Sequence, residues 1–305
     1  MVTNSVDIII PVYNASQQVE DCVNSVLHNT DTDFNLIIID DASPDSRIGT
    51  YLAKLEKIAD QRIQVSRNQK NLGFIGTVNR GMSINNRDVV LLNSDTLVTP
   101  GWLQKLKHCA ATDNRIGTIT PFSNNAEICS FPLFCQSNPV PENPDLVAQA
   151  MVVQQPTYPE IPTAVGFCMY ITRNLLNNIG LFNEQAFGRG YGEENDFCRR
   201  AVNAQYRNVL CDDAYVVHVG SCSFGDEKQA HCERNMQILL DLHPDYMDVV
   251  SEFITRDPIK PIREAAQSRL EQLIAQTEKT QHQQSLSNQG IAMKFWAQLR
   301  QLFHG

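Results

Sequence analysis

Polar side chains follow three apolar runs in the first third of the chain, at the points where buried strands are expected to end. The apolar runs span residues 6–11, 36–39 and 89–92. In an open parallel sheet the carboxyl ends of the strands share one edge, and ligands bind in the crevice beyond it. We therefore expect six side chains to converge on one crevice: Tyr13, Asn14, Asp40, Asp41, Asn93 and Asp95.

A second group of side chains that could carry out chemistry is the acidic run 193–196, which follows three alternating glycines at 188, 190 and 192. Acidic side chains at the start of a helix stabilise its dipole, which accounts for one or two of them. It does not account for the glycines before them. A carboxylate held at such a turn can also act as a general base and remove a proton from a hydroxyl group.

The elements that must position these residues form a β-α-β pattern. Apolar runs alternate with helical periodicity through about residue 120, which predicts strands at 6–11, 36–39, 63–66, 89–92 and 116–120 and a sheet essentially complete at that point. A segment rich in proline and asparagine, 122–162, is expected to cover the site, with a helix that begins near Asn143. Residues 165–172 and 209–218 are again strand-like.

Composition restricts the classes of function. The chain has 305 residues, of which 42% are hydrophobic, and 34 acidic residues outnumber 25 basic ones. This charge balance disfavours a broad nucleic-acid footprint. No apolar run approaches the roughly 20 residues that span a bilayer, and the N-terminus lacks a signal-peptide pattern, so we expect a cytoplasmic protein.

The nine cysteines include no C-x-x-C pair, and several lie in apolar stretches, which favours reduced and mostly buried thiols. His218, Cys222, His231 and Cys232 lie close together in the sequence. Their spacing fits none of the usual zinc-finger patterns, so a zinc site is the less favoured interpretation.

Five short motifs, in this order and at these expected strand ends, together resemble the family 2 glycosyltransferases of GT-A fold. The resemblance covers about residues 5–225 and rests on IIIPVYN (8–14), IDDAS (39–43), NLGF (71–74), LNSDT (92–96) and GEEND (192–196). It implies an α/β protein with a Rossmann-like, mostly parallel sheet flanked by helices. It also implies inverting transfer of a sugar from a nucleotide diphosphate to a hydroxyl group.

The resemblance implies how the nucleotide is held. Tyr13 would stack on the base, and Asp41 would accept the ring N–H of uracil or thymine, so a UDP- or dTDP-sugar is the expected donor. The residues expected at the nucleotide are Pro11, Tyr13, Asn14, Asp41, Asn71, Gly73, Asn79, Asn93 and Ser94.

The resemblance also implies a divalent metal, Mn²⁺ or Mg²⁺, bound by Asp95 and His218. Asp95 stands at the metal-binding end of the family's D-x-D motif, whereas Asn93 replaces its first aspartate. An amide brings no negative charge, so we expect Asn93 to bind the ribose or the donor sugar instead. An imidazole ligand favours Mn²⁺ over Mg²⁺. An ordinary core histidine is the alternative interpretation of His218.

For the reaction itself, Glu194 matches the position of the family's base, and Glu193 and Asp196 are expected to bind hydroxyl groups or to orient that base. The expected partners are a nucleotide-sugar donor and a glycan or lipid-linked acceptor in surface polysaccharide or glycan synthesis, without nucleic acid.

Two other functions remain open. A non-catalytic sugar-nucleotide-binding module is suggested by Asn93, but the chain retains Asp95, His218 and Glu194. A nucleotidyltransferase would require a glycine- and basic-rich loop after the first strand, where this chain has Tyr13 and Asn14. The same lack of glycine argues against a dinucleotide-binding loop.

Three regions are expected along the chain: a nucleotide-sugar-binding and catalytic domain at 1–225, a helical extension at 226–280, and a flexible tether with an amphipathic helix at 281–305. The apolar stripe of that last helix lies beside Lys294 and Arg300. Such a stripe covers its own domain or a sister subunit, or it rests peripherally on the inner face of a membrane.

Overall fold

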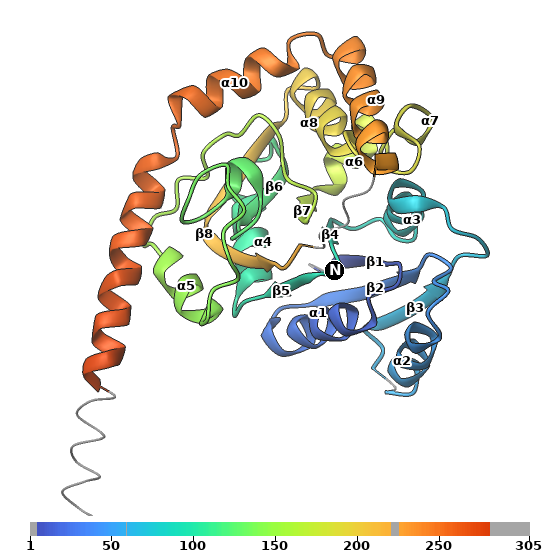
Figure 1. The fold of residues 1–305 in the computed structure, drawn as a ribbon, viewed down its shortest axis with the longest axis horizontal. Helices are drawn as coiled ribbons and strands as arrows, with labels where there is room; N and C mark the ends of the chain where they lie inside the picture. Colours follow the sequence, from blue (N-terminus) through green and yellow to red (C-terminus); the bar gives the residue numbers. More distant parts are fainter. Residues whose placement is uncertain (1–4, 59, 221–225, 281–305) are drawn as a thin grey trace, which may run out of the picture.

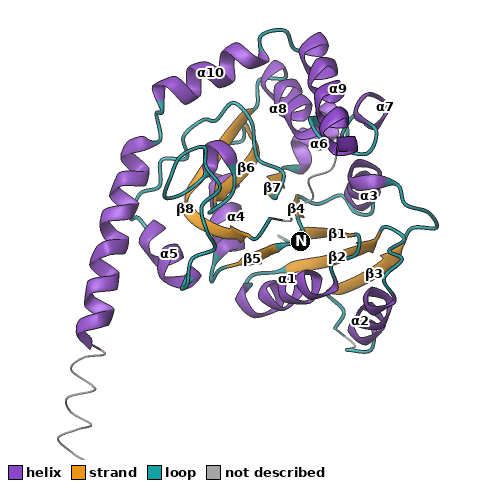
Figure 2. Cartoon of the chain, viewed as in Figure 1, coloured by secondary structure: helices purple, strands orange, loops and turns teal. Residues whose placement is uncertain are grey.

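One curled sheet of eight strands organises the protein, with helices on both faces (Figures 1 and 2). The computed structural model describes residues 5–58, 60–220 and 226–280, of which residues 226–230 are described by their backbone alone. The strand order across the sheet is β3-β2-β1-β4-β7-β6-β8-β5. The predicted α/β class with a GT-A sheet is confirmed.

The N-terminal half of the sheet is parallel. β1 pairs with β2 on one side and with β4 on the other, and β3 pairs with β2, all in parallel register. Strand β1 alternates sides, because Ile8 and Ile10 pack into one core whereas Ile9 packs into the other. The elements of this half are β1 (Val6–Val12), α1 (Ser16–Asn29), β2 (Phe34–Asp40), α2 (Ser46–Glu56), β3 (Ile63–Arg67), α3 (Gly73–Met82) and β4 (Val89–Leu92).

The C-terminal half of the sheet is mixed. β7 (Cys168–Ile171) lies antiparallel between β4 and β6 (Ile116–Phe122). β8 (Arg207–His218) pairs in parallel with β6 and in antiparallel register with the short β5 (Thr96–Val98). The expectation that the sheet is essentially complete near residue 120 was therefore wrong, because β7 enters its centre and β8 extends it.

Helices close both faces of this half and carry the loops toward the site. They are α4 (Trp102–Thr112), the 3-10 turn η1 (Glu127–Cys129), α5 (Pro144–Met151), α6 (Arg173–Ile179), α7 (Glu184–Phe187) and α8 (Glu193–Asn203). Helix α5 begins as predicted, with the Asn143 side chain accepting a hydrogen bond from Leu146 N.

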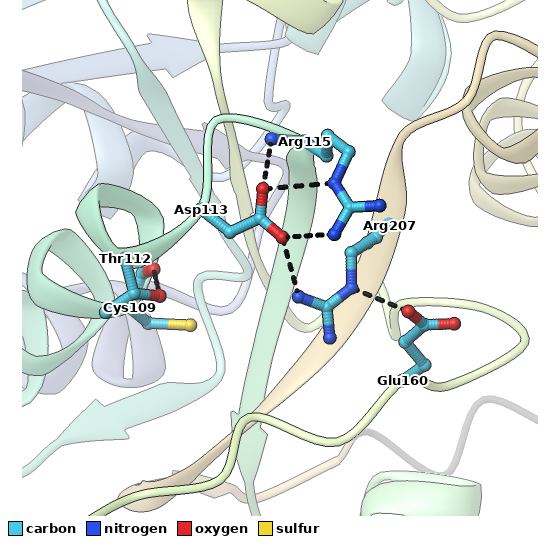
Figure 3. A network of polar contacts seen from close by, with 6 residues as sticks. All are labelled: Cys109, Thr112, Asp113, Arg115, Glu160 and Arg207. Atoms are coloured by element: carbon cyan, nitrogen blue, oxygen red, sulfur yellow. Dashed lines mark hydrogen bonds and ion pairs between the residues drawn. The ribbon is translucent and has the colours of Figure 1, made fainter.

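A polar network ties the start of β6 to the start of β8 (Figure 3). The carboxylate of Asp113 accepts hydrogen bonds from Arg115 and from Nη1 of Arg207, and Nε of Arg207 lies 2.6 Å from Oε1 of Glu160. The paired guanidinium of Arg115 holds the pKa of Asp113 well below its usual range. Because these charges face solvent, the network fixes strand ends more than it adds stability.

The C-terminal region is helical, as predicted. α9 (Asp226–Leu242) and α10 (Tyr246–Arg256) are followed by further helix up to residue 280. Ile259 and Ala266 of this last segment lie in the same core as the sheet, and Nε of Arg269 donates to Ala150 O at 2.6 Å. The domain boundary at residue 225 remains a prediction, and the tether and amphipathic helix at 281–305 lie outside the described residues. Over the described ranges, no helix has the length and apolarity that a bilayer crossing requires.

Candidate active site

A cavity of about 580 Å³ opens at the carboxyl ends of β1, β2 and β4. The parallel register explains the convergence, since it brings the ends of the three strands to one edge of the sheet. A second cavity, of about 530 Å³, lies against α4 and contains none of the predicted site residues. The predicted residues that line the first cavity are Pro11, Tyr13, Asp41, Asn71, Gly73, Asn93, Ser94 and Asp95.

Asp41 links the end of β2 to the start of α3. Its Oδ1 accepts the N–H of Leu72 at 2.7 Å, and its Oδ2 accepts the N–H of Gly73 at 2.9 Å. The side chain of Asn68 donates to Oδ1 as well, at 2.8 Å. A carboxylate has about four acceptor positions, so capacity remains on Oδ2 for a ligand donor. In the same cavity, Tyr13 is half exposed and offers an aromatic face for stacking.

Asp95 and His218 are brought together by strand pairing. β5 follows Asp95 directly, and Thr96 pairs with His218 at the end of β8. Nε2 of His218 lies 3.6 Å from Oδ1 of Asp95. Two ligands about 2.1 Å from one octahedral cation lie about 3 Å apart, so this pair fits a shared cation with little adjustment.

The surroundings of His218 also suit a metal ligand. Nδ1 lies 2.7 Å from the carbonyl oxygen of Asn125, which assigns the proton to Nδ1 and leaves the lone pair of Nε2 toward Asp95. The ring stacks on Phe167 with centroids 5.2 Å apart. Burial lowers and the Asp95 carboxylate raises the pKa of His218, with a net upward shift. Among the described residues there is no group of three or more His, Cys, Asp or Glu side chains suited to a metal.

The acidic motif lies at the start of α8. The Oε2 atoms of Glu193 and Glu194 are buried and have no hydrogen-bond partner among the described residues. Burial raises the pKa of Glu194 to about 7. Burial and the neighbouring Glu194 carboxylate raise the pKa of Glu193 well above its usual range. A carboxyl group with a pKa near neutrality suits a general base.

Glu194 is close to the segment that contacts both Asn93 and His218. A Cβ atom at Gly166 would lie 4.0 Å from Cγ of Glu194. The next residue, Phe167, stacks on His218 and accepts a hydrogen bond from Asn93 N at 2.9 Å. Glu194 is therefore linked to His218 through the adjacent residues Gly166 and Phe167.

Seven residues expected at the crevice or the site are absent from the lining of the cavity: Asn14, Asp40, Asn79, Glu193, Glu194, Asp196 and His218. Asn14 shapes the turn after β1, where its N–H donates to Ser43 Oγ at 2.9 Å. Asn79 exchanges two hydrogen bonds with the backbone of Phe182. Asp196 is buried and bound on both oxygens, to Arg200 at 2.8 Å and to His243 at 2.8 Å.

Eight lining residues were not among the predicted site residues: Val12, Ala15, Gln18, Phe74, Thr77, Arg189, Tyr191 and His231. Arg189 and Tyr191 belong to the glycine-rich run 188–192. A basic side chain in that run, next to the acidic motif, is the sequence feature that could have identified Arg189 as a site residue. His231 is one of the four residues of the zinc interpretation. Another of the four, Cys222, lies outside the described residues. The described cysteines are free, and six of them are buried: Cys22, Cys109, Cys129, Cys168, Cys198 and Cys211.

The arrangement of sheet and site defines the GT-A class of glycosyltransferase fold. The structure resembles that of GalNAc-T7 with UDP, GalNAc and Mn²⁺, with a TM-score of 0.62 and 14% identity over 87% of this chain and 54% of that one. It also resembles the mannosyltransferase PcManGT from Pyrobaculum calidifontis in complex with GDP-Man and Mn²⁺, with a TM-score of 0.55 and 16% identity over 90% and 75% of the two chains. At these identities the likeness shows the fold alone.

Sequence comparisons relate part of the chain to known glycosyltransferases. Residues 7–133 match the model of glycosyl transferase family 2. An uncharacterized glycosyltransferase of Haemophilus influenzae is 29% identical over 33% of this chain and 31% of its own length. The putative teichuronic acid biosynthesis glycosyltransferase TuaG of Bacillus subtilis is 39% identical over 30% and 35%. The chain thus spans about a third of these relatives. Within residues 7–133 the chain is therefore similar to glycosyltransferase family 2.

Proposed function

We propose that this protein transfers a sugar from a UDP- or dTDP-sugar to a hydroxyl group of a glycan or lipid-linked acceptor, with inversion at the anomeric carbon. The observation that carries the proposal is one cavity that combines Asp41, Asn93 and Asp95 from neighbouring loop segments. A cavity that is lined by both a base-binding and a metal-binding carboxylate would suit the two ends of a nucleoside diphosphate.

The departing diphosphate needs a cation or fixed donors to neutralise its charge. Asp95 and His218 would hold a divalent ion, with the diphosphate and water completing its coordination. Such an ion, when bound, stabilises the charge that develops on the leaving group. GalNAc-T7 and PcManGT, whose folds this chain shares, are complexed with Mn²⁺. Arg189, at the edge of the same cavity, adds a positive charge on the protein side.

Glu194 supports the catalytic part of the proposal. The acceptor hydroxyl must lose its proton as its oxygen attacks the anomeric carbon, and inversion requires that attack from the face opposite the diphosphate. Burial raises the pKa of Glu194 to about 7, so the carboxylate can accept this proton near neutral pH. A module that only bound sugar nucleotides would have no use for it.

The class of product and the cellular location are proposed from fewer observations. TuaG is described as a putative teichuronic acid biosynthesis enzyme, which supports surface polysaccharide as the product class. A cytoplasmic protein, with peripheral contact at the inner face of the membrane, would suit a lipid-linked acceptor. The helix expected to make that contact belongs to residues 281–305, outside the described ranges.

The test is thermal stabilisation by UDP, dTDP, GDP and NAD, each with and without Mn²⁺. A ligand at about 100 times its dissociation constant stabilises a protein by roughly 2.7 kcal/mol. We expect stabilisation by UDP or dTDP that requires Mn²⁺ and disappears in Asp95→Ala. Transfer is then measured with a panel of sugar donors. Stabilisation by NAD alone, or by no nucleotide, would refute the proposal.

A further inference from the structure

The loop between α7 and α8, residues 188–192, carries two side chains of the donor cavity but has no regular backbone structure. Four of its residues have a positive φ: Gly188, Gly190, Tyr191 and Gly192. A segment of this kind cannot satisfy its carbonyl groups through helix or sheet, so other elements must do so. Its two sides are fixed by two different parts of the chain.

The first anchor lies at the start of α3. Phe74 N donates to the carbonyl oxygen of Arg189 at 3.0 Å, and the Arg189 guanidinium donates to the side-chain oxygen of Asn71. Gly73 has a φ of +79°, and a Cβ there would lie 2.9 Å from Cα of Arg189. Since Asp41 binds the N–H of Gly73, the base side of the cavity is tied to the loop directly.

The second anchor comes from α9, which lies beside α7 and α8 (Figure 1). The side-chain amide nitrogen of Asn235 donates to the carbonyl oxygens of Phe187, Gly190 and Tyr191, at 2.9, 2.7 and 3.0 Å. Asn235 is 1% exposed, so these carbonyl groups have little access to water as a replacement. One turn earlier, Nε2 of His231 lies 3.1 Å from the carbonyl oxygen of Gly190.

Between the two anchors, Arg189 and Tyr191 face the cavity together with His231 of α9. The Tyr191 and His231 rings meet edge to face, with centroids 6.1 Å apart. α9 thus contributes one side chain to the cavity wall and a second that holds the loop behind it. This helix begins about ninety residues after the end of the family match at residue 133.

We propose that Asn235 is a positioning residue of the donor site, which holds the 188–192 loop so that Arg189 and Tyr191 contact the bound nucleoside diphosphate sugar. The inference rests on the proposed function for the identity of that ligand. The anchoring of the loop does not depend on the ligand, so it can be measured separately. On this view the C-terminal extension is part of the donor site and not only a cover for the sheet.

Limited trypsin digestion tests the anchor without any ligand, since the exposed Arg189 provides a cleavage site inside the loop. In Asn235→Asp, which keeps the volume but removes both N–H donors, we expect cleavage after Arg189 to be about tenfold faster, the effect of losing one or two hydrogen bonds. Asn235→Ser, which keeps one donor, should be intermediate and serves if the first variant does not fold. Gln237→Ala, exposed on the same helix, is the matched control and should match the wild type.

Titration with UDP and Mn²⁺ tests the link to the donor site. Asn235→Asp should weaken UDP binding about tenfold in the wild-type background and less than about twofold in Arg189→Ala, because the two residues act through one contact. Equal cleavage rates, or equal losses of affinity in both backgrounds, would overturn the inference. If the wild type binds no nucleotide, the proposed function fails, whereas the digestion still decides whether Asn235 anchors the loop.

Discussion

Nε2 of His218 lies 3.6 Å from Oδ1 of Asp95, although 123 positions separate the two residues in the sequence. Two backbone features hold them there: the pairing of Thr96 with His218, and the hydrogen bond from Val219 N to the carbonyl oxygen of Asp95 at 2.9 Å. The pair is therefore fixed by the main chain, and a cation need not assemble it.

If the pair holds a divalent ion, neither residue suffices alone. We expect Asp95→Ala and His218→Ala each to abolish the Mn²⁺-dependent part of the stabilisation by UDP, which is about 2.7 kcal/mol at 100 times the dissociation constant. The double variant should lose no more than either single variant, since both act on one ion. Thermal melts with and without Mn²⁺ measure this. Asp45→Ala, at the N-cap of α2 and outside the lining of the cavity, is the control. Independent, additive losses would argue against a shared ion.

Replacement of the proposed base should separate binding from chemistry. Glu194→Gln keeps the shape of the side chain but cannot accept the proton of the acceptor, so kcat should fall by a factor of about 10² to 10⁴. Isothermal titration should give unchanged UDP affinity. Glu184→Gln, exposed on the neighbouring α7, should keep full activity. Transfer by Glu194→Gln at the wild-type rate would remove Glu194 from the mechanism.

The pH dependence follows from the same residue. Burial raises the pKa of Glu194 to about 7, and the base works only when it is deprotonated. Activity should therefore be low in acid, rise through pH 7 and level off about one unit above it. Initial rates under kcat/KM conditions report this ionisation in the free enzyme. A profile that stays flat between about pH 5.5 and 8.5 would contradict the assignment.

The tight contact between Gly73 and Arg189 gives a prediction with a matched control. Gly73→Ala should lower the free energy of unfolding by about 2 kcal/mol, from the left-handed backbone and the displaced loop, and should also weaken UDP binding. Gly101 has a similar φ of +74°, but a Cβ added there would meet nothing within 4 Å, so Gly101→Ala should show the backbone cost alone. Denaturant melts and UDP titration distinguish the two. Equal UDP affinity in both variants would show that the contact does not matter to the donor.

The parallel half of the sheet could be predicted mainly because β1, β2 and β4 are short runs rich in Val, Ile and Leu that are buried on both faces. The edge strand β3 is only partly buried. The structure gives β4 the predicted bounds, 89–92, and extends β1, β2, β3, β6 and β8 by one to three residues. It shortens the strand expected at 165–172 to β7, Cys168–Ile171. β5 was not predicted, because three residues after a turn are too few to show a period. The central place of β7 was not predictable either, since its pairing with β4 joins residues about eighty positions apart.

The candidate site likewise combines residues that local sequence patterns could place and residues that only tertiary packing places. Residues at strand ends, such as Asp41 and Asn93, could be placed because the sheet edge places them. Asp196 was expected to bind a hydroxyl group or to orient the base, and no pattern in the sequence indicated that His243, on a distant segment, contacts one of its oxygens. The contributions of Arg189 and His231 depend on how α9 packs on the loop, and local patterns in the sequence do not encode that.

The antiparallel insertion of β7 has a consequence for how such proteins diversify. It separates a half of the sheet built from one continuous stretch, which contributes Pro11, Asp41 and Asn93 to the cavity, from a half assembled out of later segments. Recombination after residue 133 would exchange β7, β8 and α9 and would leave the strands from β1 to β6 in place. An exchange that imported a foreign α9 would, however, alter the wall beside the inherited half. Functional chimeras are therefore expected to be those in which residues 188–192 and α9 have the same parent.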